Sequence, residues 1–234
     1  MGCSLLDILY PPHCYLCGEP VEEHRYICRD CLDDFQEITG PVCEKCGKPS
    51  LKSGGLCSRC ATGDREFFLA RSFGSYEPGG GLAKSIKGLK YEGERALAKD
   101  LGALLELGET GDLVEQVEAV AFVPLSREKL EERGFNQAEL LARVLARRRD
   151  LPLLRALEKV EVTRPQAELG REQRLVNVRG SFSYTEEVDY ESVLLVDDVF
   201  TTGATVDECS RVLKRAGAER VYVVTLARSY PESS

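Results

Sequence analysis

The sequence predicts an α/β protein: a mainly parallel sheet with flanking helices, preceded by a small N-terminal metal-binding domain. Two observations lead to this fold class. After about residue 67, apolar runs typical of buried strands alternate with amphipathic helical stretches, as in a sheet covered on both faces. Before residue 61, eight of the ten cysteines form four Cys-x-x-Cys pairs, which is typical of zinc sites. We therefore expect two domains, at residues 1–66 and 67–234.

The cysteines of the N-terminal domain form an internal repeat, in which each copy reads C-x2-C-x10-C-x2-C. A Cys-x-x-Cys turn presents two thiolates to one ion, so two such turns complete a tetrahedral zinc site. The sequential allocation predicts two structural zinc ions, one held by Cys14, Cys17, Cys28 and Cys31 and the other by Cys43, Cys46, Cys57 and Cys60. An allocation crossed between the two repeats, or iron–sulfur ligation, stays open as an alternative. A closed all-thiolate site has no free position for a substrate, so we expect no catalysis there.

Charge and hydropathy narrow the classes of function. The chain carries a net charge of −8, so contact with nucleic acid would require a local basic patch. No apolar run approaches the roughly 20 residues of a membrane span, so we expect no membrane insertion. The first nine residues lack the basic side chains with which a secretory signal begins.

The strands and helices of the second domain follow from its hydrophobic pattern. Strands are predicted at residues 67–73, 117–123, 193–196 and 221–226. Helices are predicted from Leu82 onward with a break at residues 91–93, at 138–149, and after residue 205. Sites in sheets of this kind lie at the carboxyl ends of the strands. Residues 124–127 and 197–205 are two such ends, and we expect the functional site there.

The most informative segment is residues 193–205, in which four apolar residues precede Asp197 and Asp198. A small-residue loop follows, made of Thr201, Thr202, Gly203, Ala204 and Thr205, and then a helix. Such a loop points backbone N–H groups and the positive end of a helix at one place, where a phosphate binds well. The carboxylates repel phosphate, so we expect them to accept hydrogen bonds from sugar hydroxyls or to hold a metal ion. Together the two parts predict a site for a phosphorylated sugar.

This segment resembles the signature of type I phosphoribosyltransferases, which bind phosphoribosyl pyrophosphate (PRPP). The resemblance implies that Asp197 and Asp198 contact the ribose 2′- and 3′-hydroxyls and that residues 201–205 wrap the 5′-phosphate. It also implies a cytoplasmic protein, in which the cysteine thiols stay reduced.

A sugar pyrophosphate requires cations on its leaving group, which Mg²⁺ and nearby basic side chains can supply. The candidate side chains are Lys90, Arg127 and Arg164. Lys90 is spaced to share a helix face with Lys84 and Lys87, a pattern that fits a solvated face equally well. Arg127 follows a strand, where the resemblance places the pyrophosphate loop. Arg164 begins a polar stretch that fits either an active-site flap or a surface loop.

Taken together, the motifs resemble the ComF family over nearly the whole chain. The motifs are the paired Cys-x-x-Cys turns, Leu89-Lys90-Tyr91, Arg133-Gly134-Phe135-Asn136-Gln137-Ala138, Thr163-Arg164-Pro165-Gln166, Asn177-Val178-Arg179-Gly180-Ser181-Phe182 and the PRPP signature. The resemblance implies a double zinc ribbon joined to a phosphoribosyltransferase-like domain. Members of the family are linked to natural competence and to the use of certain carbon sources.

Two functions are therefore expected from the sequence. In the first, the chain binds Mg²⁺–PRPP and transfers its phosphoribosyl group to an unknown acceptor. In the second, it is a non-catalytic accessory protein of DNA uptake that binds single-stranded DNA or protein partners. The basic stretches at residues 84–90 and 143–149 are the sequence features that favour the second function.

Overall fold

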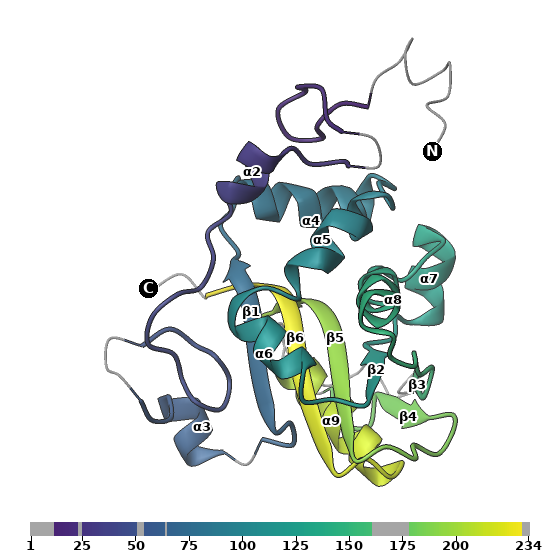
Figure 1. The fold of residues 1–234 in the computed structure, drawn as a ribbon. Coiled ribbons are helices and arrows are strands. Elements are labelled where there is room, and N and C mark those ends of the chain that lie inside the picture. Colours follow the sequence, from purple (N-terminus) through teal and green to yellow (C-terminus); the bar gives the residue numbers. More distant parts are fainter. Residues whose placement is uncertain (1–11, 23–24, 51–53, 64, 161–177, 231–234) are drawn as a thin grey trace, which may run out of the picture.

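The fold is built around a four-stranded parallel sheet in the order β1-β6-β5-β2 (Figure 1). The computed structural model describes residues 12–22, 25–50, 54–63, 65–160 and 178–230. The strands of the sheet are β1 (Leu69–Ser75), β2 (Ala119–Phe122), β5 (Ser192–Phe200) and β6 (Arg220–Arg228). A separate antiparallel ribbon is formed by β3 (Leu157–Lys159) and β4 (Phe182–Tyr184). The predicted α/β class with a mainly parallel sheet is confirmed.

Helices and the ribbon cover the two faces of the sheet. One face carries α4 (Gly81–Tyr91), α5 (Leu97–Leu104), α6 (Gly108–Val114) and α8 (Gln137–Arg149). The other face carries α9 (Ala204–Arg215) and the β3–β4 ribbon. Along β5, Leu194 and Val196 lie in the first core whereas Val193 and Leu195 lie in the second, because successive side chains of a strand point to opposite faces. A run of adjacent apolar residues is thereby buried on both sides.

Several predicted helix ends have a local cause in the structure. The helix predicted from Leu82 is broken into α4 and α5, with Gly93 in the left-handed region at φ +76°. Helix α8 begins after Asn136, whose side-chain oxygen accepts hydrogen bonds from the N–H groups of Ala138 (2.9 Å) and Glu139 (3.4 Å). The short helix α7 (Arg127–Arg133) lies between β2 and α8 and was not expected from the hydrophobic pattern.

The cysteine-rich segment lies along the sheet instead of apart from it. Among its described residues, α2 (Arg29–Asp33) and α3 (Ser58–Thr62) are short helices. Between them, the chain runs antiparallel to β1, where the Ile38 N–H donates to the Phe73 carbonyl and the Ser75 N–H donates to the Gln36 carbonyl, both at 2.9 Å. This pairing covers the outer edge of β1, which would otherwise present unpaired backbone groups.

The paired cysteines lie in two segments, the first unit (residues 14–31) and the second unit (residues 43–60), which pack into different cores. Cys14 of the first unit lies in the core under α4 and α5, and the Asp100 carboxylate of α5 accepts hydrogen bonds from the N–H groups of Tyr26 (2.7 Å) and Ile27 (2.9 Å). Cys43, Cys46 and Cys60 of the second unit lie in the core on the α9 side. None of the helices in the described ranges is long and apolar enough to cross a membrane.

Candidate functional site

The eight paired cysteines form two groups of four, one in each unit. The groups are Cys14, Cys17, Cys28 and Cys31, and Cys43, Cys46, Cys57 and Cys60, with the ligand atoms of each within 4.8 Å of one another. The structure thus groups the cysteines as the sequential allocation predicts, and neither group mixes cysteines of the two repeats.

The sulfur spacing of both units fits a tetrahedral zinc ion. The Sγ atoms of Cys17 and Cys28 are 3.7 Å apart, and those of Cys46 and Cys57 are 3.8 Å apart. A tetrahedron with Zn–S bonds of about 2.3 Å has edges of about 3.8 Å, which matches both distances. This spacing suits four thiolates on one shared ion, since an iron–sulfur cluster divides its four thiolates among two or more iron atoms.

Asp198 and Lys90 form a buried ion pair at the tip of β5. Lys90 Nζ, from the last turn of α4, lies 2.8 Å from Asp198 Oδ1, and their side chains are 19% and 6% exposed. The second oxygen, Asp198 Oδ2, is buried and has no hydrogen-bond partner among the described residues. A buried acceptor without a partner is costly, so this oxygen is suited to a hydroxyl donor or a hydrated cation that enters the site.

Asp197 lies on the opposite face of β5 from Asp198. Burial, and after it the neighbouring Asp198 carboxylate, raise the pKa of Asp197 to about 8. The hydrogen bond that the Asp198 N–H donates to Asp197 Oδ1 (2.9 Å) and the charges of Lys90 and Lys159 act in the opposite direction and lower this pKa. The charge of Asp197 in turn raises the pKa of the buried Cys209 thiol, after the larger effect of burial. The acidic pair therefore places one carboxylate beside α4 and the other on the side of α9.

The loop after β5 leads into helix α9, in the order of strand, loop and helix that the sequence predicts. Gly203 has φ +78° and is the residue before α9, and a Cβ atom there would lie only 2.8 Å from Cε1 of the Phe200 ring. Glycine is therefore required on both backbone and steric grounds. Gly203 has no side chain to cap the helix, and the Ala204 N–H donates to Thr202 Oγ1 at 3.3 Å. The next N–H groups of the first turn of α9, those of Thr205 and Val206, are therefore the ones that an anion can bind. On the other side of the loop, the Thr202 carbonyl accepts hydrogen bonds from Arg59 Nη1 (3.0 Å) and Arg65 Nη2 (3.1 Å).

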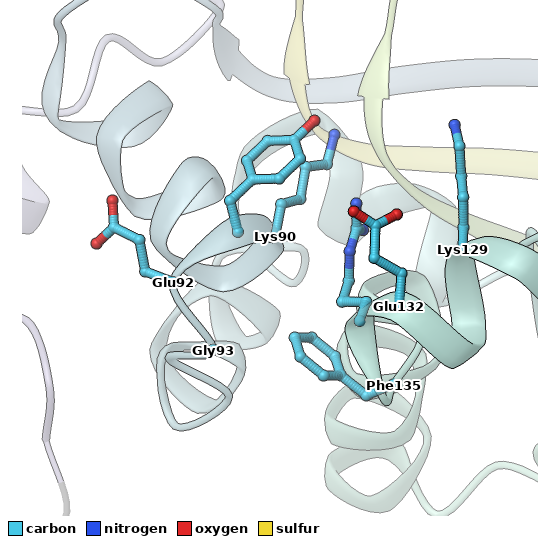
Figure 2. A pocket seen from close by; sticks show the side chains of 8 residues that line it. Lys90, Glu92, Gly93, Lys129, Glu132 and Phe135 are labelled. Carbon is cyan, nitrogen blue, oxygen red and sulfur yellow. The ribbon is translucent and has the colours of Figure 1, made fainter.

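A hollow of about 500 Å³ adjoins Lys90 between the end of α4 and helix α7. Figure 2 shows the side chains of the two helices facing each other across it. It is lined by Lys90, Tyr91, Glu92, Gly93, Lys129, Glu132, Arg133 and Phe135. The Arg133 guanidinium lies 5.2 Å from the centre of the Tyr91 ring, which is 74% exposed. The hollow thus combines three cationic side chains with two aromatic rings.

The structure separates the predicted cationic residues. Lys90 reaches Asp198, whereas Lys84 and Lys87 are exposed and line a different hollow beside the first unit. Arg127 is the first residue of α7, where its 87% exposed side chain pairs with Glu131 at 2.9 Å. Arg164 lies outside the described residues.

Two residues of the motif at 133–138 have structural roles that the sequence alone did not reveal. Gly134 ends α7 in the left-handed conformation at φ +75°. The buried Asn136 caps α8 and also donates from Nδ2 to the Val123 carbonyl (2.9 Å), just past the end of β2. These two residues aim Arg133 and Phe135 into the hollow. A glycine followed two residues later by asparagine is a helix-end and helix-start signal that could have identified α7.

Comparisons with known proteins find a matching family for each of two parts of the chain. A model of the double zinc ribbon domain matches residues 5–61, and a model of the phosphoribosyl transferase domain matches residues 130–232. The chain is similar to Competence protein F of Haemophilus influenzae, with 31% identity over 212 residues, covering 87% of this chain and 90% of that protein. It is also similar to Competence protein ComFC of Bacillus subtilis (28% identity, 87% and 84% covered) and to DNA utilization protein YhgH of Escherichia coli (30%, 94% and 98%).

Proposed function

Since this chain belongs to the ComF family, with its double zinc ribbon and phosphoribosyltransferase domain, we propose that it binds PRPP at the carboxyl end of β5. The observation that carries the proposal is the loop at residues 201–205, which combines the left-handed Gly203 with the N-terminus of a twelve-residue helix. The 5′-phosphate of PRPP binds there, because backbone N–H groups and the helix dipole both favour an anion.

The ribose lies over the acidic tip of β5. Asp198 Oδ2 accepts a hydrogen bond from a ribose hydroxyl, which relieves its lack of a partner in the described part of the chain. Asp197 lies on the other face of the strand. It binds the ribose after its carboxylate rotates toward the edge of the sheet at which the strands have their carboxyl ends. Its raised pKa favours the protonated acid at neutral pH, which can donate as well as accept a hydrogen bond.

The pyrophosphate extends from the ribose toward Lys90. Mg²⁺, which prefers carboxylate, phosphate and water oxygens, accompanies the pyrophosphate as in other phosphate sites. Lys90, Arg127 and Arg164 are the basic residues that we assign to the pyrophosphate. Of these, Lys90 is already beside Asp198, whereas Arg127 must leave Glu131 to take part.

The reaction that such a site supports is transfer of the phosphoribosyl group. The bond between the anomeric carbon and the pyrophosphate oxygen breaks, and the pyrophosphate leaves with its electron pair. A new bond forms between the anomeric carbon and a nucleophilic acceptor, whose proton passes to solvent. The hollow between α4 and α7 is where we place the acceptor, because it adjoins Lys90 and has the volume of a small-molecule site.

Calorimetric titration with PRPP and Mg²⁺ tests the binding step. We expect one site per chain and a Kd at least about tenfold higher in Asp198→Asn, because the variant loses a charge-assisted hydrogen bond. Asp189→Asn is the matched control, since Asp189 is exposed in the loop that leads into the opposite end of β5. Absence of binding to folded protein, or equal affinity of Asp198→Asn and wild type, would refute the proposal. Release of pyrophosphate, measured with candidate acceptors, then tests the transfer step.

The names of the relatives, competence protein and DNA utilization protein, favour a second candidate function in the handling of single-stranded DNA. In the basic stretch of α8, Arg143 pairs with Glu139, and both Arg148 and Arg149 pair with Glu106. These carboxylates offset only part of the positive charge of the stretch, in which Arg147 is also exposed. Lys84 and Lys87 are the exposed cations of α4 that remain. Fluorescence anisotropy with a labelled oligonucleotide should show binding that weakens steeply with salt. Binding that is absent at low salt would exclude direct contact with DNA.

A further inference from the structure

The second cysteine unit is connected to the phosphate loop by Arg228, the last residue of β6. Arg228 is only 4% exposed. Its Nη1 donates to the Cys46 carbonyl at 2.7 Å, and its Nη2 donates to Cys46 Sγ at 3.3 Å. The same guanidinium lies 4.1 Å from the centre of the Phe200 ring. One buried side chain therefore contacts both a zinc ligand and the residue that ends β5.

Phe200 carries this connection into the phosphate loop. Its ring is 2% exposed and lies against Gly203, where even a Cβ atom would collide with it. Phe67, two residues before β1, meets the same ring edge-to-face at 6.2 Å. Since buried rings pack without free space, a shift of Phe200 has to move the backbone at Gly203.

A second, independent connection reaches the other side of the loop. Arg59 lies in α3, between the ligands Cys57 and Cys60, and donates to the Thr202 carbonyl at 3.0 Å. Arg65 donates to the same oxygen at 3.1 Å. Arg59 belongs to the second unit, and Arg65 lies between that unit and β1.

The negative charge of a zinc-loaded second unit explains why a buried arginine lies beside Cys46. Four thiolates and one Zn²⁺ have a net charge of −2, and a buried charge of this size requires a cation nearby. Arg228 supplies that cation with the two-pronged geometry of a guanidinium. The first unit has a different environment, because its contacts are with α4 and α5, through Tyr15 and Asp100.

We propose that the second unit, when it holds zinc, positions the phosphate loop through Arg228 and Arg59. Zinc binding at residues 43–60 and sugar-phosphate binding at residues 201–205 then strengthen each other, because a coupling between two sites is reciprocal. Arg228 and Arg59 are positioning residues, since they act through Phe200 and through the Thr202 carbonyl. The ligand part of this inference rests on the proposed function.

The test compares Arg228→Met and Arg59→Met with Arg220→Met in the full-length, zinc-loaded protein. Arg220 is the matched control, because it begins the same strand and lies over an aromatic ring, Phe68, at 5.9 Å. Arg59 is exposed, so its variant tests the idea even if Arg228→Met is too unstable. Three quantities are measured: hydrogen exchange of residues 200–206, the Kd for ribose 5-phosphate, and the rate of zinc release to a chromogenic chelator.

We expect amide exchange at residues 200–206 to rise about tenfold in both test variants and to stay unchanged in Arg220→Met. The Kd for ribose 5-phosphate should rise by a similar factor, as for the loss of a hydrogen bond from a charged donor. Saturating ribose 5-phosphate should slow the release of one of the two zinc ions by at least about fivefold in wild type, and this protection should disappear in Arg228→Met.

Different results separate the two proposals. Wild type could bind ribose 5-phosphate while the ligand leaves zinc release unchanged and the variants leave amide exchange of the loop unchanged. In that case the coupling is refuted and the proposed function stands. If wild type binds neither ribose 5-phosphate nor PRPP, the proposed function and the coupling both fail, whatever the exchange shows.

Discussion

Replacing Lys90 with methionine would remove the cation from a buried pair and leave a carboxylate without compensation. The Asp198 side chain is 6% exposed, its Oδ1 pairs with Lys90 Nζ at 2.8 Å, and its Oδ2 has no partner in the described part of the chain. Methionine has a similar length and fills the same volume, so packing changes little. The effect on stability therefore reports the loss of charge.

The size of the effect follows from the distance and the burial. At 2.8 Å and an effective dielectric constant of about 20, Coulomb's law gives an attraction of about 6 kcal/mol. Part of this offsets the desolvation of both groups, so the pair itself adds little net stability. When Lys90 is removed, the desolvation of Asp198 is no longer offset by an attraction, so we expect the free energy of unfolding to fall by about 3 to 5 kcal/mol.

Urea denaturation at pH 7, with the protein fully loaded with zinc, measures this difference. Lys87→Met is the matched control, because Lys87 is exposed on the same helix, and we expect a change of about 0.5 kcal/mol or less. The double variant Lys90→Met/Asp198→Asn should regain most of the lost stability, since no buried charge remains in the pair. If Lys90→Met is no more destabilising than Lys87→Met, Lys90 does not compensate a buried charge on Asp198, and the prediction is refuted.

Three further predictions concern other parts of the site. The pKa of Asp197 is raised from 3.8 to about 8, so between these pH values the folded state binds a proton that the unfolded state releases, and stability falls as pH rises. Because Asp197→Asn cannot lose this proton, its free energy of unfolding relative to wild type should increase by up to about 1.4 kcal/mol per pH unit in urea denaturation. Parallel pH profiles of the two proteins would contradict this. Gly203→Ala, which meets the Phe200 ring at φ +78°, should raise the Kd for ribose 5-phosphate at least about tenfold. By contrast Gly217→Ala, strained at φ +130° beyond the other end of α9, should lower the melting temperature and leave that Kd unchanged. Metal analysis should give two zinc ions per wild-type chain and one in Cys17→Ser; two in the variant would contradict separate four-cysteine sites.

The features that could be predicted from the sequence depend on near neighbours in the chain. The strand, acidic tip and glycine turn of residues 193–205 form one continuous pattern, and the structure has them in that order. The zinc ligands repeat at fixed spacing, and each group of four closes on itself. Local geometry was enough for these features because a strand, a turn and a Cys-x-x-Cys knuckle are short-range structures.

The features that could not be predicted depend on contacts between distant residues. Lys90 and Asp198 were both candidates, yet only the packing of α4 over the sheet decides that they touch while Lys84 and Lys87 do not. Arg228 looks like an ordinary cation at the end of a strand, and its burial results from the second unit lying over it. Helix α7 buries none of its residues, so it has no apolar stripe to reveal it.

The strand order has a consequence for how the protein is made. Strand β6 lies between β1 and β5, so β1 has no parallel neighbour in the described sheet until residue 228 has been synthesised. At ribosomal rates of about 5–20 residues per second, β1 waits roughly 8 to 30 s after its own synthesis. During this time the edge of β1 that later pairs with β6 stays open, whereas its outer edge can pair with residues 36–38, which precede it in the chain. Early zinc binding would thus give the nascent chain a folded segment that covers one of the two edges of β1 against aggregation.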